Sequence, residues 1–358
     1  MKALIAMSGG VDSAVAAMLM QERGWDCIGC TMRLYDAPSV EGGRTCCSLD
    51  DVEDARSVAN RLGIPFYAFN YKEEFRKAVI DPFIRAYQAG RTPNPCIDCN
   101  REMKFSRLHL RAQELGCDAV VTGHYARIEQ EGDRFVLKKA LDPEKDQSYV
   151  LYSLTQAQLA HTIFPLGEMT KPEVRAVAAQ HGFRNAQKPD SQDICFVPDG
   201  DYARVIEHYT GEPAVPGDYL SPQGDVLGQH QGIIHYTVGQ RKGLGVAFGK
   251  PKFVCGIDPA RNAVILGDAE DLFQAQATVR AFHWISGEAP AGPIRCKAKI
   301  RYRQAETACM VTPTGGGIRI DFDQPQRAIT PGQAAVLYDG DVVLGGGEIT
   351  GAGKEAAV

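Results

Sequence analysis

The sequence predicts an α/β protein: a doubly wound parallel sheet, followed by a small β-rich domain and a C-terminal β-barrel. Up to about residue 125, strand-like apolar runs alternate with helical stretches, an order typical of a parallel sheet. From about residue 205 glycines and prolines recur and helical periodicity ends, and from about 275 short strands alternate with turns, as in a barrel. The expected domains are residues 1–204, 205–272 and 273–358.

Composition narrows the class of protein. The chain has 358 residues, 44% of them hydrophobic, and a formal net charge of −5, so an RNA site would have to be a local patch. No apolar run approaches the ~18 residues that cross a bilayer, so we expect no membrane partner. Eleven cysteines, an odd number, without a recognisable signal peptide indicate a reducing compartment, and we expect a cytoplasmic protein.

The first predicted element is a strand, a tight turn and a helix. An apolar run at 3–7 leads into Ser-Gly-Gly-Val-Asp-Ser at 8–13, and the helix ends at Gly24. Glycines let backbone N–H groups approach a ligand, and a helix N-terminus favours an anion. The run lacks the Gly-Lys-Ser/Thr of a Walker loop and is not the dinucleotide fingerprint. The sequence therefore indicates a phosphate-binding turn, with an ordinary capped turn as the alternative.

The following elements continue the alternation. Further strands are expected at 27–32, 64–69 and 117–122, and helices at 52–62, 72–90, 108–115 and across 150–185. Loops are expected at 36–48 and, because of its two prolines, at 91–100. Ligands of parallel sheets gather at the carboxyl ends of the strands, which predicts a site formed by the 8–13 turn, Met32, the 94–99 loop and Gly123.

Two cysteines lie in unusual surroundings. Cys99 and Cys195 are flanked by polar residues and prolines rather than by apolar periodic runs. The common alternative is a small buried hydrophobic residue. Cys96, Cys99 and Cys195 would also suit three irons of a four-iron cluster, but Cys-x-x-Cys with one remote cysteine is a weak signal, and we do not favour it. We expect no other resident metal.

A run of alternating cations marks the last third of the chain. Every second position is a cation, namely Arg295, Lys297, Lys299, Arg301 and Arg303, and the gaps are filled by Cys296, Ala298, Ile300 and Tyr302. On a strand this would place five cations on one face. A solvated face usually mixes charges of both signs, so we favour a strand that binds phosphates.

Together these motifs resemble the tRNA-specific 2-thiouridylases, members of the ATP pyrophosphatase family with an adenine nucleotide alpha hydrolase-like fold. The resemblance covers nearly the whole chain, through residues 8–13, 92–95, 99–100, 122–125, 145–149, 194–196, 236–245 and 301–303. It implies an enzyme that uses ATP and Mg²⁺ to adenylate the C2 oxygen of the wobble uridine of tRNA. Sulfur would then come from a cysteine persulfide, loaded by a sulfur-donor protein such as a cysteine desulfurase or a relay protein.

The resemblance also implies roles for individual residues. ATP would be held by Ala6, Met7, Ser8, Gly9, Gly10, Val11, Asp12, Ser13, Met32 and Gly123. Asn94, Pro95 and Cys96 would line the pocket for the target base, with Cys99 the catalytic nucleophile and Cys195 the persulfide carrier. Contacts with tRNA would come from His124, Lys145, Asp146, Gln147, Arg301, Tyr302 and Gln333. Some relatives have aspartate where this chain has Cys96, which puts a carboxylate role there in doubt.

Two other functions fit part of the sequence. An ATP-dependent amide-forming ligase acting on a small molecule would use the same turn but would need neither Cys99 nor Cys195. A non-catalytic tRNA-binding or sulfur-carrier protein would not need the phosphate-binding turn. The two cysteines favour the sulfurtransferase.

Overall fold

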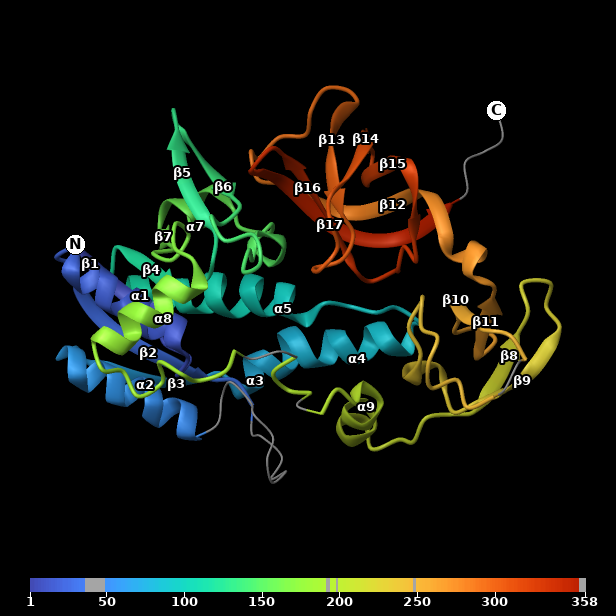
Figure 1. The fold of residues 1–358 in the computed structure, drawn as a ribbon, viewed down its shortest axis with the longest axis horizontal. Coiled ribbons are helices and arrows are strands. Elements are labelled where there is room, and N and C mark those ends of the chain that lie inside the picture. The colour runs from blue at the N-terminus through green and yellow to red at the C-terminus, as the bar shows by residue number, and fades with distance from the viewer. Residues whose placement is uncertain (36–48, 191–193, 198, 247–248, 354–358) are drawn as a thin grey trace.

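The computed structural model describes residues 1–35, 49–190, 194–197, 199–246 and 249–353. The loop expected at 36–48 lies outside these residues. Figure 1 shows an α/β layer at the N-terminal end, a barrel at the C-terminal end, and a small sheet beside the barrel. None of the described helices is both long and apolar enough to cross a bilayer.

The first sheet is parallel throughout, as predicted. Its strands lie in the order β3-β2-β1-β4-β7. Their bounds are β1 Lys2–Ala6, β2 Asp26–Arg33, β3 Phe66–Asn70, β4 Ala119–Thr122 and β7 Thr162–Ile163. The strand order reverses between β1 and β4, where Ala6 pairs with both Cys30 and Thr122. A ligand of such a sheet binds beyond the carboxyl ends of the strands at this reversal.

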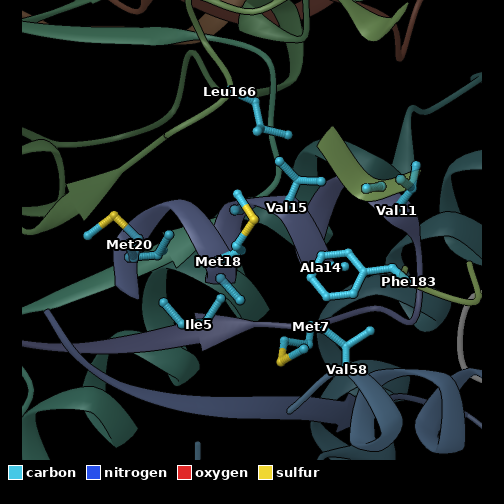
Figure 2. Packing of buried hydrophobic residues seen from close by; sticks show 14 of the residues in the cluster. Ile5, Met7, Val11, Ala14, Val15, Met18, Met20, Val58, Leu166 and Phe183 are labelled. Atoms are coloured by element: carbon cyan, nitrogen blue, oxygen red, sulfur yellow. The ribbon is translucent and has the colours of Figure 1, made fainter. Parts of the chain in front are cut away.

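Helices cover both faces of this sheet. They include α1 Val11–Glu22, α2 Leu49–Leu62, α6 Leu108–Glu114 and α8 Lys171–Gln180. Helix α1 is buried on nearly all sides, which its run of alanines, valines and methionines allows. Figure 2 shows Val15 and Met18 of α1 among Ile5, Leu166 and other apolar side chains of this core. The turn predicted to bind phosphate therefore precedes a helix that is packed into the hydrophobic core.

The segment around Cys99 is a helix and not the loop expected at 91–100. It comprises α5 Pro95–Asp98, a π-helical segment η2 Cys99–Arg107, and α6. The Asn94 side chain caps the start, because Oδ1 accepts from the Cys96 N–H at 3.1 Å. Pro95 occupies the first helical position, where its missing N–H is not needed. The two prolines thus mark the start of a helix. Cys96 and Cys99 lie on the first turns of this helix.

A second long helix precedes that segment, as expected at 72–90. It is built from α3 Lys72–Phe75, the π-helical segment η1 Arg76–Ile80 and α4 Asp81–Gln88. The helical pattern expected across 150–185 is confirmed in part. The structure has η3 Ser148–Val150, α7 Gln156–Ala160, β7 and α8 there. Capping boxes that begin with Thr155 and Thr170 start two separate helices.

The small sheet and the barrel follow. Helix α9 Tyr202–Thr210 leads into a sheet ordered β10-β11-β8-β9. Its strands are β8 Gly217–Leu220, β9 Val226–His230, β10 Phe253–Asp258 and β11 Ala263–Gly267, with short helices η4 Ile233–His235 and η5 Ala269–Leu272. The barrel strands are β12 Phe273–Trp284, β13 Ile294–Lys299, β14 Thr307–Thr314, β15 Gly317–Arg327, β16 Ala334–Asp339 and β17 Val342–Gly353. Pairing of β12 with β17 closes the predicted barrel.

An unpredicted hairpin connects the first domain to the barrel. Its strands are β5 Arg127–Glu131 and β6 Arg134–Lys138, and Lys138 pairs with Val342 of β17. The backbone of Thr92 also donates to the Pro331 carbonyl at 2.8 Å. The barrel therefore lies against the segment between α4 and α5, as Figure 1 shows.

The predicted basic strand is wrong in its geometry. Strand β13 ends at Lys299, and Arg301 and Arg303 lie in the turn beyond it. The Arg301 guanidinium points inward and donates to the Ala328 carbonyl at 2.8 Å and to Thr330 Oγ1 at 2.7 Å. Five cations therefore do not share one strand face, and Arg301 joins parts of the C-terminal half instead.

Candidate active site

The 8–13 turn is shaped by contacts that only glycine allows. Gly9 has φ +76°, and a Cβ there would lie 2.4 Å from the carbonyl oxygen of Asp51. Ser13 Oγ accepts from the Ser8 N–H at 3.2 Å and donates to the Gly10 carbonyl at 3.1 Å. Gly10 precedes α1 without a side-chain cap. Since Gly10 has no side chain to cap them, the first N–H groups of α1 can serve an anion.

Gly123, which directly follows β4, packs against the first turn of α1. A Cβ at Gly123 would lie 2.8 Å from the carbonyl carbon of Asp12 and 2.8 Å from the Ser13 nitrogen, so β4 presses on the first turn of α1. Met32 lies near the end of the neighbouring strand β2. Thr31 Oγ1 donates to the Met7 carbonyl at 2.6 Å and holds the two strand ends together. The residues predicted for ATP therefore lie along one edge of the sheet.

A buried lysine that sequence reasoning missed lies beside this turn. Lys171 Nζ donates to Asp12 Oδ1 at 2.7 Å and to Oδ2 at 2.8 Å, and it also pairs with Asp190 at 2.8 Å. Only 9% of the Lys171 side chain is exposed, so these partners are needed to hold its charge. Tyr125 donates to Asp12 at 2.8 Å, and burial, with the Asp12 charge, raises the pKa of Tyr125.

A second missed lysine lies on the other side of Gly9. Lys188 Nζ contacts both Asp51 and Asp54 at 2.6 Å, and the Asn185 amide donates to the Gly9 carbonyl at 3.1 Å. Burial alone would lower the pKa of Lys188, but the hydrogen bonds with these carboxylates raise it. Nothing local in the sequence distinguishes Lys171 or Lys188 from other lysines. Two cations therefore flank the turn where a pyrophosphate would lie.

Lys145, predicted to contact tRNA, belongs to the same charge network. Its Nζ pairs with Asp190 Oδ2 at 2.8 Å, and Arg175 pairs with Asp190 Oδ1 at 3.1 Å. Burial would raise the pKa of Asp190, but its lysine partners lower it. Asp190 thus stays ionised between three cations. The following residues 191–193 lie outside the described part of the chain.

Cys99 and Cys195 pack against the same hydrophobic cluster, although they are far apart in sequence. Both are half-buried and pack against an aromatic cluster that includes Tyr35, Phe75 and Phe196. The Tyr35 hydroxyl donates to the Cys195 carbonyl and ties that segment to the end of β2. Cys96, one helical turn before Cys99, is exposed. Across the described ranges, no three His, Cys, Asp or Glu side chains group as metal ligands would.

Several residues predicted to contact tRNA make internal hydrogen bonds. His124 is 7% exposed and lies between Thr122 Oγ1 at 2.7 Å and Lys104 Nζ at 3.2 Å. Burial, with the Lys104 charge, lowers the pKa of His124 well below its usual range, so its ring is neutral at pH 7. Gln147 Oε1 accepts from the Tyr125 N–H at 3.0 Å. Their contacts with tRNA stay predictions.

The remaining members of that set lie where the barrel meets the first domain. Asp146 Oδ1 accepts from the Ala140 N–H at 3.0 Å, and the Tyr302 hydroxyl donates to the Asp146 carbonyl at 3.3 Å. Gln333 Nε2 donates to the Thr92 carbonyl at 2.7 Å. Thr92 lies two residues before the cap of α5. Gln333 thus connects the barrel to the segment that precedes the helix carrying Cys99, and Tyr302 connects it to Asp146 of the first domain.

Asp98, next to Cys99, gives a testable pH dependence. Burial raises the pKa of its carboxyl to about 6. The charge of Arg101 lowers this pKa, and the charges of Glu102 and Glu348 raise it. Because this pKa lies above that of the unfolded chain, the neutral carboxyl stabilises the fold at low pH, and the contribution is lost as the pH rises through about 6. Asp98→Asn should therefore raise the free energy of unfolding at pH 8 by about 2 kcal/mol.

Urea unfolding from pH 4.5 to 8 measures this effect. The gain from Asp98→Asn should shrink as the pH falls, while Asp341→Asn, which removes a 66% exposed carboxylate paired with Arg127, should change little at any pH. A loss of stability in Asp98→Asn at pH 8 would show that the ionised Asp98–Arg101 pair stabilises the fold.

Three family models match successive parts of the chain. Residues 1–199 match the family model described as the tRNA methyl transferase HUP domain. Residues 203–268 match its PRC-barrel domain, and 274–349 match the aminomethyltransferase beta-barrel domain. Among solved structures, a 4-thiouridine synthetase–RNA complex with bound ATP is similar with a TM-score of 0.39 and 23% identity, over 55% of this chain and 45% of that one.

Curated relatives match over nearly their full length. The chain is 49% identical to the tRNA-specific 2-thiouridylase MnmA of Clostridioides difficile (strain 630), over 97% of this chain and 98% of the relative. It is 52% identical to the proteins of the same name from Moorella thermoacetica and Symbiobacterium thermophilum, over 97% of this chain and 98% and 92% of theirs. The chain belongs to the tRNA-specific 2-thiouridylase family.

Proposed function

We propose that the protein catalyses the ATP-dependent 2-thiolation of the wobble uridine of tRNA. The proposal is carried by two features that occur together in this chain. Lys171 and Lys188 flank a glycine turn that has no side-chain cap from Gly10. Cys99 and Cys195 pack against one hydrophobic cluster. Full-length relatives that are about half identical carry the name of this activity.

The ATP step makes the C2 oxygen of uracil a good leaving group. Adenylation of that oxygen releases pyrophosphate and divides one difficult substitution into two easier ones. The turn around Gly9 and the N-terminus of α1 would hold the pyrophosphate, with Lys171 and Lys188 supplying positive charge. Mg²⁺ normally accompanies a triphosphate and uses one or two carboxylates, and Asp12 is the carboxylate of the turn itself.

The sulfur step uses the two cysteines in sequence. A sulfur-donor protein would load Cys195 as a persulfide, and the Cys99 thiolate would attack its inner sulfur. That attack forms a Cys99–Cys195 disulfide and releases sulfide, which adds to C2 and expels AMP. A dithiol reductant then restores both thiols. The sulfur donor, like the cytoplasmic location expected from the cysteine content, is part of the proposal.

The target base must leave its stack to react. A base inside a helical stack is out of reach of catalytic groups, so uridine would be extruded into a pocket lined by Asn94, Pro95 and Cys96. Lys145, Asp146, Gln147, His124, Arg301, Tyr302 and Gln333 would position the tRNA around it. An amide-forming ligase would leave Cys99 and Cys195 without a role, and the relatives do not carry that name.

Mass spectrometry of tRNA nucleosides tests the proposal. Incubation of an unmodified tRNA transcript with the protein, ATP and a sulfide source should yield 2-thiouridine at the wobble position, with AMP and pyrophosphate as products. Reactions without ATP, or with a tRNA that has cytidine at that position, should yield none. A methylated nucleoside, or ADP and phosphate as products, would contradict the proposed function.

A further inference from the structure

A cavity of about 280 Å³ lies between the barrel and the helices α4 and α5. Its wall contains four arginines from separate parts of the chain: Arg85, Arg91, Arg101 and Arg280. Arg85 comes from α4, Arg101 from η2 and Arg280 from β12, so folding brings them together. The carboxylates on the wall are Asp98 and Glu348. Cations thus exceed anions in this cavity, in a chain whose formal net charge is −5.

The two carboxylates on the wall bind different arginines. Asp98 pairs with Arg101 at 2.7 Å, and Arg101 also binds Glu102 at 2.9 Å, so Arg101 is largely engaged. Glu348 is shared, because Oε1 binds Arg91 at 2.6 Å while Oε2 binds Arg280 at 2.8 Å. Each guanidinium has five N–H donors, so both arginines keep donors for another acceptor. Glu348 therefore holds two guanidinium groups in place without using up their hydrogen bonds.

Arg85 has the fewest side-chain partners of the four arginines on the cavity wall. Its side chain is exposed at the cavity wall, and it makes no hydrogen bond or ion pair with the residues that the structure describes. Arginine is suited to phosphate because its planar fork donates two parallel hydrogen bonds to one oxyanion group. Two positioned guanidiniums and one with open donors make a suitable site for a single phosphate group.

The cavity adjoins the proposed base pocket. Asn94, which lines the cavity, is the cap of the helix that carries Cys96 and Cys99. Gln333, between the lining residues Gly332 and Ala334, donates to the Thr92 carbonyl at 2.7 Å. A strand of RNA that placed a base beside Asn94 would therefore have its adjoining backbone near the arginines.

We propose that this cavity binds a phosphodiester group of the tRNA backbone next to the target uridine. The inference rests on the proposed function and adds a substrate contact to it. Backbone contacts fix the register of a nucleic acid without reading its sequence. Arg85, Arg91 and Arg280 would hold the strand in place while the neighbouring base leaves its stack.

Alanine variants measured against a matched control test the contact. Arg85→Ala and Arg280→Ala should each weaken binding of a tRNA transcript several-fold and reduce the slope of log K against log[salt] by about 0.7 per lost contact. ATP binding should not change. Arg319→Ala is the control, because Arg319 and Arg280 are both barrel arginines with 54% exposed side chains and one carboxylate partner, but only Arg280 lines the cavity.

A neutral backbone probe locates the contact. In an anticodon stem-loop with single methylphosphonate substitutions, one position adjoining the target uridine should weaken binding to the wild type and have little further effect on Arg85→Ala. A wild type that thiolates tRNA while Arg85→Ala and Arg280→Ala keep its affinity and salt slope would overturn the inference and leave the proposed function intact. A wild type that binds no tRNA would overturn both.

Discussion

Replacing Cys195 with serine is expected to abolish tRNA thiolation, by on the order of 10³-fold or more. Serine cannot carry a persulfide, so when a sulfur-donor protein is the source, no sulfur would reach the activated uridine. Cys99→Ser should have the same effect, because a hydroxyl at that position cannot release sulfide from the persulfide at neutral pH. Binding of tRNA and release of pyrophosphate on a single turnover should persist in both variants, because adenylation precedes the sulfur step. Nucleoside mass spectrometry and a filter-binding assay measure the two properties separately.

Cys255→Ser is the matched control for the cysteine variants. Cys255 is half-buried, as Cys99 and Cys195 are, but lies on β10 of the small sheet. Burial raises the pKa of Cys255, which keeps its thiol protonated and unreactive. Thiolation should therefore continue in Cys255→Ser. Activity that survives in Cys195→Ser when a sulfur-donor protein is the only source of sulfur would show that Cys195 does not carry the sulfur.

Cys96→Ala separates the persulfide route from an iron–sulfur cluster. Cys96 is exposed on the first turn of α5, one turn before Cys99. The persulfide route should survive its loss at least in part, whereas a cluster held by Cys96, Cys99 and Cys195 should lose both iron and activity. Anaerobic purification with iron analysis, followed by the same tRNA assay, distinguishes the two. Bound iron in the wild type together with complete inactivity of Cys96→Ala would exclude the persulfide route.

The parts of the fold that the sequence predicted were those set by local patterns. The alternation of strands and helices was enough for a parallel sheet, and short strands between turns were enough for the barrel. The loop predicted around Pro95 was wrong, because proline suits both an extended loop and the first position of a helix. The prediction that Arg301 lies on the same strand as the preceding cations was wrong. No local feature of the sequence shows that β13 ends at Lys299.

The missing parts of the site depend on contacts between distant segments. The Lys171–Asp12 pair joins residues that are 159 positions apart, and a lysine at the start of a helix has no pattern that marks such a role. The same holds for Lys188 with Asp51. Sequence motifs pointed to the turn and the cysteines because the chemistry proposed for them requires those residue types. The supporting charges could come from any lysine that the fold brings near.

The second large effect is expected at Asp12. Asp12→Asn should lower formation of AMP and pyrophosphate by about 10²- to 10³-fold, a range typical of losing one electrostatic group that acts on the transition state. The amide keeps the shape of the side chain but removes the charge that holds Lys171 Nζ at 2.7 and 2.8 Å. Asp54→Asn is the control, because Asp54 is similarly exposed and also pairs with a lysine beside the turn.

A double variant shows whether Asp12 and Lys171 act as one unit. Lys171 is held between Asp12 and Asp190, so the loss of Asp12 would leave it directed at Asp190 and away from the turn. If Asp12 works by aiming Lys171 at the pyrophosphate, Asp12→Asn combined with Lys171→Met should be about as slow as either single variant. Multiplied losses in the double variant would show that the two groups act independently. If Asp12→Asn forms AMP and pyrophosphate as fast as the control Asp54→Asn, the turn does not hold pyrophosphate in the manner proposed.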